Sequence, residues 1–180
     1  MFRKGVSHNE FAQHMQKKFK KLEEKKGNPL KELAITDAYA LKYDQRYEHP
    51  LSVLNSCLNH IEHLKKIRFV VNRSVKDDEQ IRAGFNQYFL DNSVQKIEVI
   101  FDKDFHDRFW FINKKKAFIV GTSLNTIGNK HFFVQDKYFK SKDVEVLLDL
   151  CFPNGELREQ LNFEKDEGEW KLINIFNRQS

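Results

Sequence analysis

The sequence predicts one α/β domain in which helices cover a mixed β-sheet. Apolar residues alternate between helical and strand periods over the first 100 residues, and short β-branched and aromatic strands then cluster together. At 180 residues the chain is long enough for one ordinary domain. Its 17 phenylalanines cannot mostly be exposed on a domain of this size, so we expect most of them in the core.

The chain begins with a predicted amphipathic helix from Asn9 to about Lys26. Its apolar residues recur at helical spacing, namely Phe11, Met15, Phe19 and Leu22. Gly27-Asn28-Pro29 then ends it. Its lysines form either a solvated surface or a patch that follows phosphates, and they are Lys17, Lys18, Lys20, Lys21, Lys25 and Lys26. We therefore expect residues 1–29 to form a basic amphipathic helix and residues 30–180 the main domain.

The remaining elements follow from period, capping and turn residues. Pro50 suits the first turn of a helix, and Asp77 or Asp78 suits an N-cap. Helices are predicted at Pro50–Lys65, from Asp77 or Asp78 to Leu90, and at Asp143–Cys151. Strands are predicted at Leu33–Tyr39, Lys66–Asn72, Lys96–Asp102, Arg108–Ile112, Ala117–Gly121 and His131–Gln135. Lys42–His49 is predicted as a loop, Glu164–Glu169 as an acidic stretch, and Trp170–Phe176 as either an edge strand or a short helix.

The amino-acid composition indicates which class of partner and which cellular compartment to expect. The net charge of +5 and pI near 9.1 favour an anionic partner, without separating nucleic acid from an acidic protein. No run of about 18 apolar residues and no secretion signal occur, so we expect a cytoplasmic protein without a membrane span. Cys57 and Cys151 lack any paired spacing and are expected to be reduced.

The most informative motif combines a histidine and an arginine with a later glycine-containing segment. His106 and Arg108 lie two apart and share one face of the predicted strand. Arginine binds two phosphate oxygens at once, and a neutral histidine attacks phosphorus or donates a proton. After Gly121, the side chains of Ser123 and Asn125 add neutral hydrogen-bond donors. These residues predict a phosphate site.

The motif resembles the signature of the phospholipase D superfamily, H-x-K-x4-D followed by a glycine-rich G-S-x-N. His106 takes the place of the family's histidine, Arg108 of its lysine and Asn113 of its aspartate. The later element is matched by Gly121, Ser123 and Asn125, and an early strand ending in Asp37 and Tyr39 fits the same order. The resemblance implies catalytic roles for His106, Arg108 and Asn113, with phosphate contacts from Arg108, Ser123 and Asn125.

The resemblance also implies how the enzyme works. In the family one histidine forms a phosphohistidine and a second protonates the leaving oxygen, without a metal or cofactor. Because this chain has one motif, the implied active form is a homodimer. Arg108 and Asn113 depart from the family's lysine and aspartate, and the family's later orienting glutamate is absent, with Asp104 as a candidate replacement. The turn Asn113–Lys116 is either solvated or contributes phosphate contacts through Lys114 and Lys115.

Two further patterns favour structural roles over chemistry. Cys57, His60 and His63 recur every three residues and suggest zinc, yet this spacing drifts round a helix and no fourth ligand is evident. Trp110 and its neighbouring phenylalanines could stack on bases, but their alternation favours core packing. We therefore expect no metal.

Three functions remain open at this point. The first is a phospholipase-D-like phosphodiesterase, most simply a metal-independent nuclease with nucleic acid as its partner. The second is a catalytically impaired nucleic-acid-binding or regulatory module, for example in a bacterial or mobile-element defence system. The third is a protein-binding module that uses the N-terminal helix and the acidic tail.

Overall fold

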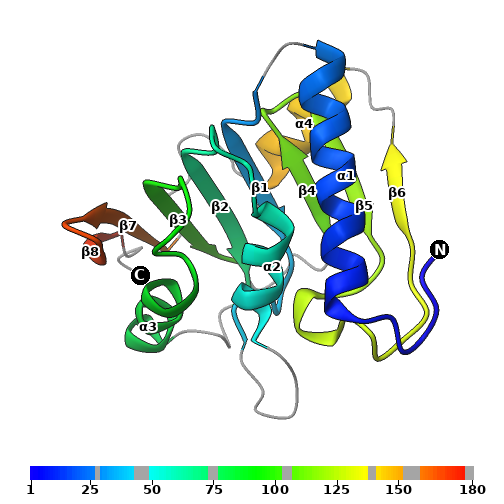
Figure 1. Ribbon diagram of the computed structural model, residues 1–180. Coiled ribbons are helices and arrows are strands. Elements are labelled where there is room, and N and C mark those ends of the chain that lie inside the picture. Colours follow the sequence, from blue (N-terminus) through cyan, green and yellow to red (C-terminus); the bar gives the residue numbers. More distant parts are fainter. Residues whose placement is uncertain are drawn as a thin grey trace.

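The computed structural model describes residues 1–26, 29–42, 49–72, 77–102, 107–137, 141–151 and 159–176. They form a mixed eight-stranded sheet with strand order β6-β5-β4-β1-β2-β3-β7-β8 (Figure 1). The helices are α1 (His8–Lys26), α2 (Pro50–Leu58), α3 (Asp78–Tyr88) and α4 (Ser141–Cys151). The strands are β1 (Glu32–Thr36), β2 (Lys66–Val71), β3 (Lys96–Phe101), β4 (Phe109–Ile112), β5 (Lys116–Val120), β6 (Val134–Lys137), β7 (Gln160–Asp166) and β8 (Glu169–Phe176). The predicted α/β class with a mixed, helix-flanked sheet is confirmed.

The sheet has a parallel centre and antiparallel flanks. Strands β1, β2 and β3 run parallel, joined by α2 and α3. Strand β4 pairs antiparallel with β1, and β7 pairs antiparallel with β3. Since β5 is antiparallel to β4, the carboxyl ends of β1 and β5 and the amino end of β4 meet at one end of the sheet.

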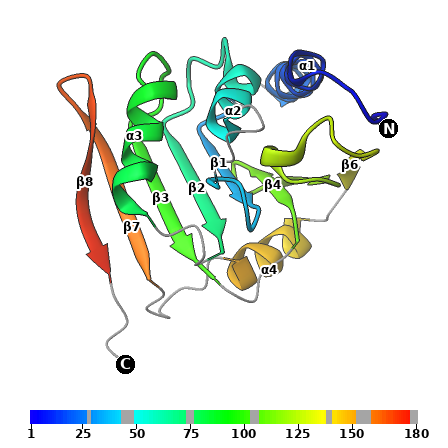
Figure 2. The same ribbon diagram turned by 90° about the horizontal axis from the view of Figure 1, so that it is seen from below.

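Helices cover the two faces of the sheet unequally. Figure 2 shows α1, α2 and α3 on one face and α4 on the other. The larger core lies under the first three helices and includes Leu33, Ile35, Phe69 and Trp110. A smaller core joins Val144 and Leu148 of α4 to the opposite face. The central strands are therefore buried on both sides, as their nearly continuous apolar sequences require.

The N-terminal helix α1 packs into the same core as the sheet. Ser7 and Glu10 cap its first turn, since the Glu10 amide donates to the Ser7 Oγ atom (3.2 Å) and the Ser7 amide donates to Glu10 Oε2 (2.9 Å). The side chains of Phe11, Met15 and Phe19 are fully buried. The ring of Phe19 stacks on Trp110 of β4 at 6.2 Å. The apolar stripe predicted for this helix is therefore part of the central core.

Helix α2 is shorter than predicted, ending at Leu58 instead of Lys65. Its C-cap Asn59 has an extended ψ of 133°, and His60 has a left-handed φ of 72°. Ile61 and Leu64 remain buried, but in a turn whose carbonyl oxygens lie 2.8 and 2.9 Å from the Ser93 hydroxyl. The apolar spacing therefore predicted correctly that Ile61 and Leu64 are buried. It did not predict that hydrogen bonds from the distant Ser93 stabilise a non-helical backbone there.

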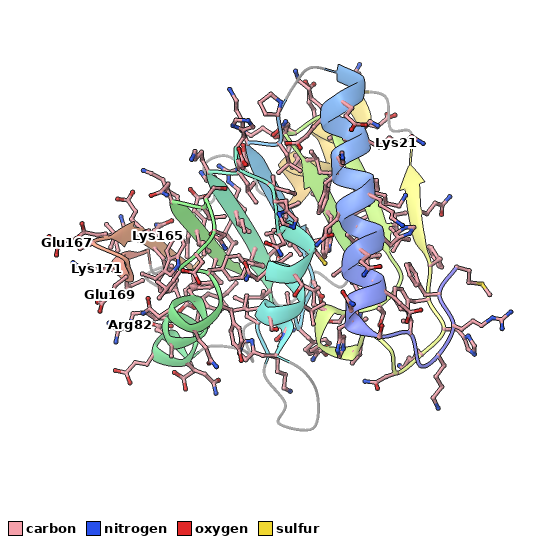
Figure 3. All side chains as sticks on the ribbon, in the orientation of Figure 1. Lys21, Arg82, Lys165, Glu167, Glu169 and Lys171 are labelled. Carbon is pink, nitrogen blue, oxygen red and sulfur yellow. The ribbon has the colours of Figure 1, made fainter. Side chains whose placement is uncertain are left out.

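The C-terminal residues form a hairpin at one edge of the sheet. Strand β8 settles the open alternative for Trp170–Phe176 in favour of an edge strand, and β7 was not predicted. In β7 only Leu161 and Phe163 point into the core, and the other residues of the strand are polar, which concealed it in the sequence. Figure 3 shows Lys165, Glu167, Glu169 and Lys171 together around the hairpin turn, far from α1. In the described part of the chain, no helix has the length and apolar character needed to cross a membrane.

Candidate functional site

The candidate site lies where β1 and β5 end and β4 begins. Asp37 follows β1, Arg108 precedes β4, and the segment Gly121–Asn125 follows β5. Ligands of open α/β sheets bind outside the carboxyl ends of the parallel strands, which is this end of the sheet. The structure thus brings Arg108 beside Ser123, as the sequence motif predicts, and adds Asp37 between them.

The centre of the site is the buried carboxylate of Asp37, which is 2% exposed. The Ser123 hydroxyl donates to both of its oxygens, with Oγ at 2.6 Å from Oδ1 and 2.8 Å from Oδ2. The amide of Leu124 donates to Oδ2 at 2.9 Å, and the amide of Tyr39 donates to Oδ1 at 3.1 Å. The carboxylate therefore ties the β5 exit segment to the end of β1.

Burial raises the pKa of the Asp37 carboxyl above its ordinary value. The hydrogen bonds from Ser123, Leu124 and Tyr39 and the nearby Arg108 charge lower the pKa, but burial is the largest effect. Asp37 was noted in the sequence only as part of the family resemblance. An acidic residue at the end of an apolar strand is the signal that marks it.

Ser123 acts differently from its predicted role. Its side chain is 2% exposed, and its single hydroxyl proton is already directed at Asp37. A hydroxyl has one proton to donate, so Ser123 has none left for a bound phosphate. Its role in this structure is to hold the 121–125 segment in place.

Arg108 is the partly exposed charged group of the site. Its side chain is 33% exposed, and its Nε atom lies 3.8 Å from Asp37 Oδ1. This distance is an ion pair without a hydrogen bond, and the buried Nε atom has no hydrogen-bond partner within the described part of the chain. The guanidinium therefore keeps donors available for a planar anion such as phosphate.

Thr36 positions the backbone that carries Arg108, and sequence reasoning missed it. The buried Thr36 hydroxyl donates to the carbonyl oxygen of Asp107 and accepts from the amide of Phe109, both at 2.8 Å. The carbonyl oxygen of Arg108 accepts from the amide of Val120 at 3.1 Å. A buried threonine at the end of an apolar strand was the available signal.

Gly121 and Asn125 belong to the glycine-containing segment on either side of Ser123. A Cβ atom on Gly121 would lie 3.2 Å from both the backbone nitrogen and the carbonyl oxygen of Phe133, so a larger residue is disfavoured there. The Oδ1 atom of the partly buried Asn125 has no hydrogen-bond partner in the residues that the structure covers. This oxygen is a hydrogen-bond acceptor, so it does not supply the donor that the motif predicts for a phosphate contact. His106, the predicted nucleophile, and Asp104 lie outside the described residues.

The structure does not bring Asn113 to this site. Asn113 follows β4 and Arg108 precedes it, so the two lie at opposite ends of that strand. The Asn113 Oδ1 atom accepts from the amides of Lys31 (2.8 Å) and Glu32 (3.0 Å), and its Nδ2 atom donates to the carbonyl oxygen of Pro29 (2.8 Å). Its observed contacts anchor the β4–β5 turn to the start of β1.

Replacing Asn113 tests this anchoring role. The Asn113→Ala variant is expected to lose about 2–3 kcal/mol of unfolding free energy, because it removes three hydrogen bonds and places alanine at a left-handed φ of 48°. Asn113→Gly removes the same bonds without the backbone strain, so it should lose about 1 kcal/mol less. Urea unfolding measures both, and equal losses would contradict the backbone contribution.

Lys114 and Lys115 lie in the same turn as Asn113. They line a pocket with Lys31 and Glu32 at the end of the sheet opposite to Arg108. The two lysines therefore do not form one phosphate site with Arg108, Ser123 and Asn125.

The zinc hypothesis finds no support in the geometry. The described residues contain no group of three or more histidine, cysteine, aspartate or glutamate side chains that could hold a metal. Cys57 is fully buried in the core, and burial raises the pKa of its thiol. His60 and His63 lie beyond the end of α2. A buried, protonated thiol is a poor metal ligand, since metals bind the thiolate.

Comparison with known proteins assigns no family to the chain. No protein-family model matches the chain, and no curated protein does.

Proposed function

We propose that the chain is a phospholipase-D-like phosphodiesterase, most simply a metal-independent nuclease. The observation that carries the proposal is the Arg108 guanidinium, one-third exposed at the carboxyl end of the parallel strands and beside the segment Gly121–Asn125. Its Nε atom has no hydrogen-bond partner among the described residues, which leaves a donor that a phosphate oxygen would satisfy. The positive net charge of the chain favours nucleic acid as the molecule that carries the bound phosphate.

The proposed reaction assigns each residue a defined step. Arg108 binds non-bridging phosphate oxygens, and the imidazole nitrogen of His106 attacks phosphorus while the bond to the leaving oxygen breaks. The second histidine, supplied by the same motif of a second copy, donates a proton to that oxygen. Water then attacks the phosphohistidine and releases the phosphate product. Asp37 does not touch substrate; it positions Ser123 and the Arg108 charge.

His106→Ala tests the proposed nucleophile. The purified protein is expected to cleave single-stranded DNA, RNA or bis(p-nitrophenyl) phosphate in EDTA, and the variant is expected to lose at least about a thousandfold in rate. The exposed His63 is the matched control, so His63→Ala should keep full activity. Sedimentation velocity should show a dimer.

Three outcomes would contradict the enzyme. They are undiminished cleavage by the His106 variant, cleavage that EDTA abolishes, and an active monomer. A monomer would supply one histidine where the mechanism needs two.

A second candidate is a nucleic-acid-binding or regulatory module that has lost turnover. Two observations favour it: Asn113 is engaged with Pro29, Lys31 and Glu32, and the Ser123 proton is directed at Asp37. Such a module would bind nucleic acid with a steep dependence on salt, and the intact protein would cleave none of the substrates above. A role in a bacterial or mobile-element defence system would belong to this candidate.

A further inference from the structure

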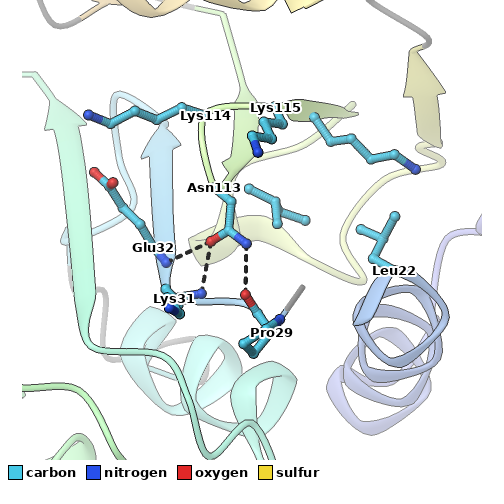
Figure 4. Close-up of a pocket in the computed structure, with 9 residues that line it drawn as sticks. Leu22, Pro29, Lys31, Glu32, Asn113, Lys114 and Lys115 are labelled. Atoms are coloured by element: carbon cyan, nitrogen blue, oxygen red, sulfur yellow. Dashed lines mark hydrogen bonds between the residues drawn. The ribbon is translucent and has the colours of Figure 1, made fainter. Parts of the chain in front are cut away.

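The pocket lined by Lys114 and Lys115 lies at the end of the sheet opposite to Arg108. It has a volume of about 300 Å³, within the range of small-molecule sites. Its apolar wall comes from Leu22 of α1, Pro29 and Ile112. Figure 4 shows Asn113 at the centre of the pocket, with dashed hydrogen bonds to Pro29, Lys31 and Glu32 and with Leu22 across from it.

The charge around this pocket is strongly unbalanced. Four of its lining residues are lysines, namely Lys31, Lys114, Lys115 and Lys116, whereas one is acidic. That residue, Glu32, already pairs with Arg68, whose Nε atom lies 3.3 Å from Glu32 Oε1. In the part of the chain that the structure describes, the exposed Lys31, Lys114 and Lys115 have no carboxylate within ion-pair distance. The pocket therefore has a positive potential that its own side chains do not neutralise.

The turn that presents these lysines is conformationally unusual. The amide of Lys115 donates to the carbonyl oxygen of Ile112 at 2.9 Å, and both central residues are left-handed, with φ of 48° at Asn113 and 57° at Lys114. Two-residue turns in which both central residues are left-handed favour glycine at the second central residue, which is Lys114 here. A lysine there is strained, and such strain is characteristic of positions where the side chain serves a function.

We propose that this pocket binds a nucleoside phosphate. The apolar wall of Leu22, Pro29 and Ile112 accommodates the flat base, and the lysines of the turn, with Lys31, bind the phosphate oxygens. This site is separate from the phosphodiesterase site and does not depend on it. Bound ligand would rest against α1, β1 and the β4–β5 turn at once.

Calorimetric titration of the full chain with ADP tests the proposal. We expect ADP to bind, adenosine and inorganic pyrophosphate to bind at least about tenfold more weakly, and Lys114→Gln/Lys115→Gln to weaken ADP binding at least about tenfold. The matched control is Lys4→Gln/Lys130→Gln, which removes the same charge from exposed lysines outside the pocket. The control should change ADP affinity less than about twofold.

Lys114→Gly separates a ligand role from a structural one. Glycine relieves the left-handed strain, so the melting temperature should rise by about 2–4 °C while ADP binding weakens. The proposal is overturned if the intact chain does not bind ADP, or if the control weakens binding as much as the turn variant. Equal affinity for ADP and pyrophosphate, or unchanged ADP affinity in Lys114→Gly, would also overturn it.

Discussion

A chain that lacks residues 1–26 is expected not to fold. Deletion removes Phe11, Met15 and Phe19 from the core, and each of these side chains is fully buried. Truncating one such residue to alanine costs about 2–5 kcal/mol, so the loss of all three is comparable to the 5–15 kcal/mol that stabilises a typical domain. Circular dichroism and size-exclusion chromatography of the truncated chain would measure the loss.

Single substitutions separate core packing from the loss of a whole segment. Phe19→Ala should lower the unfolding free energy by about 3–5 kcal/mol, and Phe19→Leu should lower it by much less because leucine refills most of the space. A folded, cooperative truncated chain would contradict the packing of α1. Because this helix belongs to the core, its lysines have to be tested for nucleic-acid binding by substitution and not by deletion.

The Asp37→Ala variant is expected to lose about 3–5 kcal/mol of unfolding free energy. Alanine leaves the Ser123 hydroxyl and the amides of Leu124 and Tyr39 without their acceptor. It also leaves Arg108 without its buried counter-charge. Urea unfolding gives the measurement. Asp78→Ala is a control with the same change of residue on the helix α3. A loss no larger than that of the control would show that Asp37 does not hold the site together.

The raised pKa of Asp37 also predicts how stability depends on pH. In the folded protein this carboxyl binds its proton more tightly than in the unfolded chain, because burial disfavours the charged form. Its contribution to stability is therefore fully present below the ordinary value of 3.8 and is lost as the pH rises through the raised pKa. Asp37→Asn, which does not titrate, should lack this loss.

Urea unfolding at a series of pH values checks the sign. The difference in stability between the natural chain and Asp37→Asn should move in favour of the asparagine variant as the pH rises from 3.8. A difference that is independent of pH, or that moves the other way, would contradict the raised pKa.

Local sequence patterns were sufficient to predict the helices and strands whose ends depend on neighbouring residues. The spacing of Phe11, Met15 and Phe19 predicted α1, and Asp77 caps α3 through Oδ1 at 2.9 Å from the Gln80 amide. The apolar runs of β2 and β3 were likewise correct. In each case the deciding contacts lie within a few residues of one another, or depend on burial that the residue type already requires.

Helices and strands whose bounds depend on contacts between distant residues could not be predicted from local sequence patterns. The early end of α2 depends on Ser93, and β7 is recognised through its pairing with β3 and β8. The motif likewise predicted that Arg108 and Ser123 come together, but it did not predict that Asp37 accepts the hydrogen bond from the Ser123 hydroxyl.

The sequence by itself determined the α/β class, the amphipathic N-terminal helix and the choice of Arg108 and the segment Gly121–Asn125 as candidate phosphate contacts. Only the tertiary structure decided that Asn113, Lys114 and Lys115 belong to the opposite end of the sheet. The physical reason is the extension of a β-strand, about 3.3 Å per residue, which separates residues that are neighbours in the motif. Residues far apart in the sequence, such as Asp37 and Ser123, meet because their strands end at the same side of one sheet.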